Sequence, residues 1–184
     1  MLPAAVPEGV RPTAAKVREA LFSMVGQRLE GWSVLDLCGG SGLVGIEAAS
    51  RGAAPVVVVE RDRAALAAIR RNVAGLPTPI HVLAGDARSL PLEPADLVYL
   101  DPPYRDPVEG WLLRASTLTR RVFVVEARRR EDFPPAPEGF VLDRVRHYGE
   151  ASLGLYERIG AGAVTAPADV VREDAAVIEA DGGG

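Results

Sequence analysis

Short β-branched runs alternate with longer stretches rich in alanine, arginine and leucine along most of this chain. The continuous β-branched run at 55–60 (PVVVVE) is typical of a strand buried in a parallel sheet, and strands are also expected at 95–100 (ADLVYL) and 121–126 (RVFVVE). Two further strands are expected at 33–38 and 79–84. The alternation predicts successive βαβ units, with helices on both faces of a mostly parallel sheet.

Helices are expected between these strands. Residues 13–29 place Val17, Leu21, Met24 and Val25 on one side at helical spacing, which predicts an amphipathic helix. The other expected helices run from the glycines at 39–42 to Arg51, from the capping residue Asp62 to 74, and over 108–117.

The last part of the predicted sheet is a hairpin. Residues 140–147 and 151–159 alternate around Tyr148-Gly149-Glu150, so two antiparallel strands bring the expected sheet to seven. Beyond residue 160 the chain consists mainly of alanine, glycine, proline, valine and acidic residues, and we expect disorder there. The expected parts are a short arm at 1–12, a domain at 13–160 and an acidic tail at 161–184.

A net charge of −4 argues at first against a nucleic-acid partner, because phosphate binding is largely electrostatic. However, residues 161–184 contain five acidic residues and one arginine, which accounts for the whole excess. The remainder is neutral, with arginines clustered at 120–121, at 128–130 and at 144 and 146. The charge therefore does not exclude RNA.

Other features narrow the class of protein. A single cysteine, Cys38, excludes an internal disulfide, and His81 and His147 lack the spacing of a zinc site, so we expect no metal. No run approaches the ~20 apolar residues that cross a bilayer. The N-terminus also lacks the pattern of a signal peptide. We therefore expect a cytoplasmic protein without a membrane partner, acting as a monomer.

A glycine-rich segment follows the first predicted strand. Gly40, Gly42 and Gly45 match the G-x-G-x-x-G pattern, and Glu60 lies twenty positions after Gly40. Such a turn lets the backbone approach a ligand at a helix N-terminus. One interpretation is an NAD-dependent oxidoreductase. The other is binding of S-adenosylmethionine, which Asp36 favours because a carboxylate before the glycines would repel a pyrophosphate.

Three acidic residues, Asp36, Glu60 and Asp86, follow or end different predicted strands, and ligands of open α/β sheets bind at that edge. In the methyl-donor interpretation, Asp36 lies near the amino group and Glu60 accepts from the ribose hydroxyls. Asp86 accepts from the adenine amine, and the Ala87 N–H meets the ring. The predicted cofactor-binding residues are Asp36, Gly39, Gly40, Ser41, Gly42, Glu60, Arg61, Asp86 and Ala87.

The most specific motif is Asp101-Pro102-Pro103-Tyr104, directly after the fourth predicted strand. Two prolines remove two donors and direct carbonyl oxygens beside a carboxylate and an aromatic ring. This arrangement suits an exocyclic amine on a planar base. Asp101 and the Pro102 carbonyl would orient the amine and favour the positive charge that develops on it. Tyr104 would stack on the flipped-out base.

In this order of motifs the chain resembles the RsmD type of small-subunit ribosomal RNA guanine-N2 methyltransferases. The resemblance spans about 10–159 and includes Arg11-Pro12-Thr13 before a helix, VLDLCGGSG, DPPY and the YGEASLGLY ending. It implies a Rossmann-like class I fold, S-adenosylmethionine as cofactor, and 16S rRNA in the small subunit or its assembly intermediate as partner. It implies catalytic-pocket roles for Asp101, Pro102, Pro103 and Tyr104, and substrate-side roles for Arg11, Thr13 and Arg18.

Two alternatives stay open beside this interpretation. A DNA adenine-N6 methyltransferase shares the DPPY motif, but no base-reading domain is recognisable in these 184 residues, which disfavours this alternative. A non-catalytic, donor-binding ribosome assembly factor is the other. The chain also departs from the family, because it lacks the usual basic N-terminal arm, carries Cys38-Gly39 in the glycine loop and ends in an acidic tail.

Overall fold

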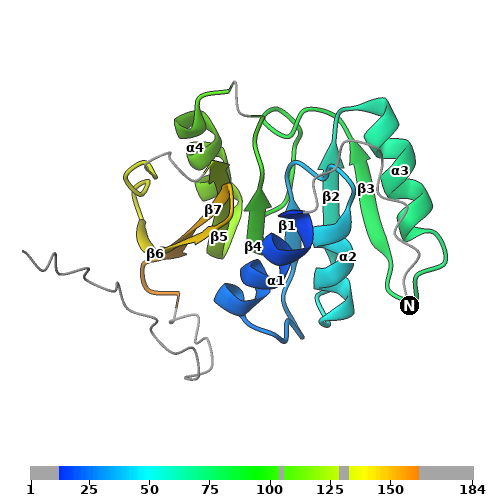
Figure 1. Cartoon of the computed structure of the whole chain (residues 1–184), viewed down its shortest axis with the longest axis horizontal. Coiled ribbons are helices and arrows are strands. Elements are labelled where there is room, and N and C mark those ends of the chain that lie inside the picture. The colour runs from blue at the N-terminus through cyan, green and yellow to red at the C-terminus, as the bar shows by residue number, and fades with distance from the viewer. Residues whose placement is uncertain (1–12, 104–105, 129–132, 162–184) are drawn as a thin grey trace, which may run out of the picture.

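The structure is a computed structural model that describes residues 13–103, 106–128 and 133–161. In this part of the chain, seven strands form one sheet in the order β3-β2-β1-β4-β5-β7-β6 (Figure 1). The strands are β1 (Val34–Asp36), β2 (Val56–Glu60), β3 (Ile80–Ala84), β4 (Ala95–Leu100), β5 (Thr119–Arg128), β6 (Phe140–Tyr148) and β7 (Ala151–Arg158). The helices are α1 (Thr13–Val25), α2 (Leu43–Ser50), α3 (Arg63–Val73) and α4 (Val108–Leu118).

Strands β1 to β5 run parallel to one another. β7 lies between β5 and β6 and is antiparallel to both, so the hairpin places its second strand inside the sheet and its first strand at the edge. The predicted mostly parallel α/β sheet with an antiparallel C-terminal hairpin is confirmed.

The strand order reverses between β1 and β4. From β1 the chain moves outward through β2 to β3, and then returns to add β4 on the other side of β1. Connections that leave in opposite directions open a crevice at the carboxyl ends of the two central strands, which is where open α/β sheets bind ligands. The topology therefore places the candidate site beyond Asp36 and Leu100.

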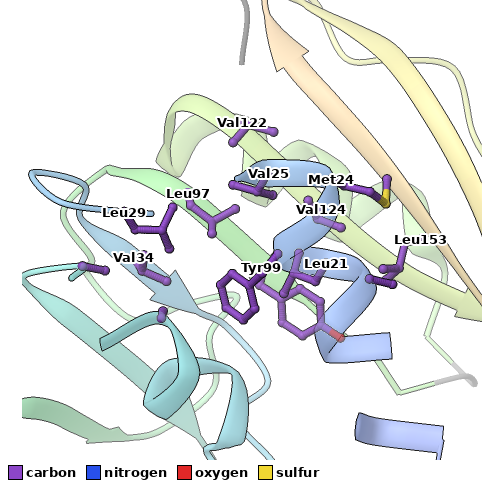
Figure 2. Packing of buried hydrophobic residues seen from close by; sticks show 14 of the residues in the cluster. Leu21, Met24, Val25, Leu29, Val34, Leu97, Tyr99, Val122, Val124 and Leu153 are labelled. Carbon is purple, nitrogen blue, oxygen red and sulfur yellow. The ribbon is translucent and has the colours of Figure 1, made fainter. Parts of the chain in front are cut away.

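Helices cover both faces of the sheet, as predicted. The core on one face includes side chains of α1, α2 and α3, and the core on the other face includes those of α4. Figure 2 shows Leu21, Met24 and Val25 of α1 among side chains of the sheet, including Leu97 and Tyr99. The predicted apolar side of α1 is buried, because the removal of such side chains from water stabilises the packed layers.

Helix α1 ends earlier than the sequence predicts. The expected helix covered 13–29, whereas α1 ends at Val25. Gly26 has a φ of 133°, outside the helical range, and its N–H donates to the Phe22 carbonyl at 2.9 Å. The Leu29 N–H then bonds to Arg51 beyond α2, so this tertiary contact replaces the last helical turn.

The other boundaries agree closely with expectation. β4 covers 95–100 as predicted, and Asp62 caps α3 by accepting from the Ala65 N–H at 2.8 Å. β5 extends beyond the predicted 121–126 because β4 and β7 pair with its two edges. The hairpin strands β6 and β7 also form as expected.

Two predicted parts cannot be compared with the structure. The arm at 1–12 lies outside the described residues, and so does the tail from 162 onward. Among the helices that the structure describes, none has the length and apolar composition required to cross a membrane.

Candidate active site

A cleft of about 410 Å³ opens at the carboxyl ends of the parallel strands. Residues from the loops after β1, β2, β3 and β4, from the first half of α1 and from the β6–β7 turn line this cleft. Of the predicted site residues, twelve line it: Arg18, Asp36, Gly39, Gly40, Ser41, Glu60, Arg61, Asp86, Ala87, Asp101, Pro102 and Pro103. The cleft thus unites the predicted cofactor residues with the segment predicted to hold the reacting amine.

The glycine loop lies flat against β2. The Gly39 N–H donates to the Val59 carbonyl at 2.9 Å, and a Cβ at Gly39 would lie 2.3 Å from Val58 Cγ1. Gly40 has a φ of 52°, in the left-handed region that glycine adopts at little cost. Only glycine therefore allows this backbone to pass so close to the strand and turn into α2.

Gly42 is the one described residue of the predicted cofactor set that does not line the cleft. Its Cα faces α3, where a Cβ would lie 3.0 Å from Ile69 Cγ2. The side chain of Asn72, also on α3, donates to the Ser41 carbonyl at 3.1 Å. Helix α3 therefore supports the loop from behind.

Glu60 connects two loops of the cleft. Its Oε2 accepts from the Gly40 N–H at 2.9 Å, and its Oε1 accepts from the N–H groups of Arg61 and Asp62 at 2.7 and 2.8 Å. A carboxylate has about four acceptor positions, so capacity remains for a ligand hydroxyl beside the three backbone donors. Glu60 thus holds the glycine loop and is still able to accept from a ribose.

Asp86, after β3, is held by arginines. Its Oδ1 accepts from the backbone N–H and Nε of Arg88, both at 3.0 Å, and its Oδ2 from Arg88 Nη2 at 2.6 Å. Arg61 Nη1 lies 3.8 Å from Oδ2. These bonds, those of Arg88 above all, lower the pKa of Asp86 to about 2. A ligand amine at this carboxylate would share it with Arg88.

Asp36, at the end of β1, has the opposite environment. It is 1% exposed, and its Oδ1 has no hydrogen-bond partner among the described residues. Burial raises the pKa of Asp36 to about 7, and the charges of Asp101 and Glu60 add to the rise. Bonds from the backbone of Cys38 and Gly45 oppose it. A donor-bearing, positively charged ligand group would satisfy this carboxyl and favour its ionised form.

Asp101, Pro102 and Pro103 continue directly from β4. Asp101 is partly exposed to the cleft and Pro102 is buried. The Pro103 carbonyl accepts from the Asp106 N–H at 2.9 Å. Tyr104, predicted to stack on a base, lies outside the described residues.

The residues expected on the substrate side are only partly described. Arg18 lines the cleft, and its Nε lies 3.7 Å from Glu47 Oε2 on α2. Thr13 is the first residue of α1, and the structure does not describe its side chain. Arg11 lies outside the described residues.

The sequence analysis missed two cleft residues on neighbouring strands. Tyr99 on β4 donates its O–H to Glu126 Oε2 on β5 at 2.5 Å, and both line the cleft. Tyr99 is 5% exposed, and burial together with the Glu126 charge raises its pKa well above the usual 10. Side chains alternate between the two faces of β4, and this alternation was the available signal for Tyr99. However, Tyr99 lies within an apolar run, and such runs usually belong to the core.

Comparisons with known proteins identify the family and the fold of the chain. The family model described as conserved hypothetical protein 95 matches residues 1–157. Ribosomal RNA small subunit methyltransferase D of Escherichia coli strain K12 is 30% identical over 175 residues, which cover 88% of this chain and 86% of that protein. A solved structure of a conserved hypothetical protein from Streptococcus pyogenes is 30% identical, with a TM-score of 0.72, and the match covers 79% of this chain and 98% of that one. The chain therefore belongs to the family of conserved hypothetical protein 95, the RsmD family, and has the class I methyltransferase fold that its motifs predicted.

Proposed function

We propose that this chain transfers a methyl group from S-adenosylmethionine to the exocyclic N2 amine of a guanine in small-subunit ribosomal RNA. One observation carries the proposal. Asp101 and Pro102 lie in the same cleft as the glycine loop and Glu60, so an amine held by the first pair would meet a cofactor held by the second. The name of the Escherichia coli relative supports ribosomal RNA as the substrate.

The described residues fit this cofactor. The buried Asp36 Oδ1 without a partner suits the cationic amino group, and the glycine loop admits the methionine part. Glu60 retains acceptor capacity for a ribose hydroxyl, while Arg61, Asp86 and Ala87 line the end expected to hold adenine. When bound, S-adenosylmethionine supplies a methyl group on a positively charged sulfur.

The residues of the chain supply orientation and charge stabilisation. A base amine is a poor nucleophile because its lone pair is delocalised into the ring. The Asp101 carboxylate and the Pro102 carbonyl each accept one N–H of this amine, which directs the lone pair and stabilises the positive charge that develops on nitrogen. Asp101 also takes the N2 proton that methylation releases. Tyr104 stacks on the flipped base.

The proposed methyl transfer to ribosomal RNA also identifies residues that would contact the RNA. Arg18 at the cleft, with Arg11 and Thr13 before it in the chain, provides groups that meet a phosphate of the RNA. The proposed partner is 16S rRNA within the small subunit or an assembly intermediate, which would place the protein in the cytoplasm as a monomer.

The first test is Asp101→Ala. The variant loses an acceptor where charge develops, so we expect methyl transfer to fall at least about 100-fold. Calorimetric affinity for S-adenosylhomocysteine should change less than threefold. The matched control is Asp143→Ala, which removes an aspartate that pairs with Arg144 on β6, outside the cleft. Normal turnover in Asp101→Ala would overturn the assignment.

Substrate class is tested with labelled methyl donor. Unmodified 16S rRNA, small subunits assembled from it, and DNA are each offered to the protein, and the labelled nucleosides are then separated. We expect label in N2-methylguanine from ribosomal RNA or subunits. Label in N6-methyladenine would support the DNA adenine alternative, and cofactor binding without any transfer would support the assembly factor.

A further inference from the structure

Tyr99 and Glu126 form a pair that the proposed methyl transfer leaves without a role. The Tyr99 hydroxyl donates to Glu126 Oε2 at 2.5 Å, and both side chains line the cleft. Tyr99 is almost fully buried against the α1 side of the sheet (Figure 2). Its rigid ring therefore holds one oxygen of the Glu126 carboxylate at a defined position.

The sheet register places Glu126 beside the proposed amine site. β4 and β5 are parallel, with Tyr99 opposite Val124 and Leu100 opposite Val125. The next positions along the two chains are Asp101 and Glu126. Glu126 is on β5, where side chains alternate between faces, and its bond with Tyr99 places it on the same face as that ring. Asp101 follows β4 directly, so Asp101 and Glu126 lie at the carboxyl ends of neighbouring strands and line the same cleft.

Asp36, which the proposed function assigns to the amino group of the cofactor, lies next to this pair. Asp36 lies opposite Tyr99 in the β1–β4 register and lines the same cleft. It is almost completely buried, yet its Oδ1 has no partner among the residues that the structure describes. An unpaired buried acceptor is costly, so the site is complete only when a donor enters.

We propose that Glu126 accepts the N1–H of the target guanine while Asp101 and the Pro102 carbonyl accept its N2 amine. Glu126 is then the residue that determines specificity for guanine, and Tyr99 is its positioning residue. Guanine carries N1–H and N2–H₂ donors side by side, whereas adenine has an acceptor at N1 that would face a carboxylate. A carboxylate has about four acceptor positions, so the bond from Tyr99 is compatible with acceptance from a base.

This inference rests on the proposed function, so the two are tested in sequence. Nucleoside analysis first identifies N2-methylguanine and the position that carries it. 16S rRNA is then assembled by splint ligation with either guanine or 2-aminopurine at that position, and is built into small subunits. 2-Aminopurine keeps the reacting amine but has no N1–H. Wild-type protein should prefer guanine at least about 30-fold in kcat/KM, because a hydrogen bond to a charged group is lost.

Glu126→Gln is the main variant. The carboxamide can turn its N–H₂ toward the base and donate to the bare N1 of 2-aminopurine. We expect kcat/KM on guanine to fall about 10- to 100-fold and the preference for guanine to fall at least about tenfold. Affinity for S-adenosylhomocysteine should stay within twofold. The matched control is Glu157→Gln, a half-buried carboxylate of β7 that does not line the cleft.

Tyr99→Phe provides a second variant that removes one hydroxyl only. It should lower the preference about three- to fivefold without a change in cofactor affinity. The matched control is Tyr156→Phe, which also loses a single hydrogen bond, the one from the Tyr156 hydroxyl to the Pro134 carbonyl at 2.9 Å. This variant should leave the preference for guanine unchanged.

Two results would overturn the inference. One is a Glu126→Gln variant that prefers guanine over 2-aminopurine as strongly as wild type does. The other is a variant that keeps this preference but loses affinity for S-adenosylhomocysteine, because Glu126 would then belong to the cofactor site. If wild-type protein makes no N2-methylguanine at all, the proposed function itself fails, and the first step of the experiment detects this.

Discussion

Asp86 and Asp36 are carboxyl groups of one cleft, and they differ in almost every physical respect. Asp86 lies near the surface after β3, and Arg88 alone provides three donors to it. Asp36 is buried at the end of β1, and one of its oxygens has no hydrogen-bond partner among the described residues. The pKa is accordingly about 2 for the first and about 7 for the second.

The environments of Asp86 and Asp36 illustrate two ways in which a protein can prepare a binding site. Near Asp86 the protein satisfies its own charges, so the end of the cleft that we propose for adenine is shaped before a ligand arrives. Near Asp36 the protein leaves an acceptor unsatisfied, and the native state bears the cost until a ligand supplies a donor. We therefore expect changes at Asp36 to affect stability and affinity strongly, and changes at the Asp86 end to affect both weakly.

The largest expected effect is on the pH dependence of stability. Between the ordinary pKa of 3.8 and about 7, folded Asp36 binds more protons than unfolded Asp36, so this group lowers the free energy of unfolding as pH rises. One pKa unit corresponds to about 1.4 kcal/mol, so Asp36→Asn should gain about 3 kcal/mol over wild type between pH 4.5 and 8. Urea unfolding of both proteins at several pH values measures this gain.

A constant difference between the two proteins from pH 4.5 to 8 would show that Asp36 ionises normally when folded.

Asp86 contributes to the pH dependence of stability with the opposite sign and outside this pH range. Its lowered pKa adds stability above pH 3.8, and this stability is lost as pH falls toward about 2. The comparison between the two carboxyls therefore predicts opposite slopes in separate pH windows.

Affinity for the cofactor should show the second largest effect. If a cationic amino group pairs with Asp36, binding of S-adenosylhomocysteine strengthens as pH rises from 6 to 8, because the ionised carboxylate is the form that binds. Asp36→Asn should weaken binding about 10- to 100-fold at pH 8 and remove this pH dependence. Calorimetry at three pH values measures both. Equal affinity of variant and wild type at pH 8 would separate Asp36 from the ligand.

The smallest expected effect concerns Arg88. This arginine is largely exposed where it pairs with Asp86, and exposed ion pairs contribute little. Arg88→Ala should change the affinity for S-adenosylhomocysteine less than threefold, measured by the same titration. A tenfold loss would show that the adenine end depends on this arginine, and the contrast between the two ends would then disappear.

Local patterns in the chain predicted most of the elements. The largely apolar run at 95–100 predicted β4 to the residue, and Asp62 marked the start of α3 through a capping bond between near neighbours. Acidic residues after strands were expected at one edge, and the structure brings Asp36, Glu60, Asp86 and Asp101 into one cleft. These predictions succeeded because they depend on short sequence separations and on the direction of parallel strands.

Other features depended on contacts between distant segments. The end of α1 is set at Gly26, and the segment after it bonds to Arg51 beyond α2. Gly42 matches a cofactor motif, yet it packs against Ile69 of α3. A residue type indicates what a position tolerates, but which neighbour it meets follows from the packing of whole elements.

By itself, the sequence determined the order of strands and helices along the chain, the edge of the sheet at which the candidate site lies, and the family to which the chain belongs. Only the tertiary structure decided that Tyr99 reaches Glu126 and that both line the cleft together with Asp101. The register between β4 and β5 sets both, because a shift of one residue would turn Glu126 to the opposite face. It also decided that Asp36 and Asp86 have opposite pKa shifts, since burial and arginine contacts come from segments far apart in the chain.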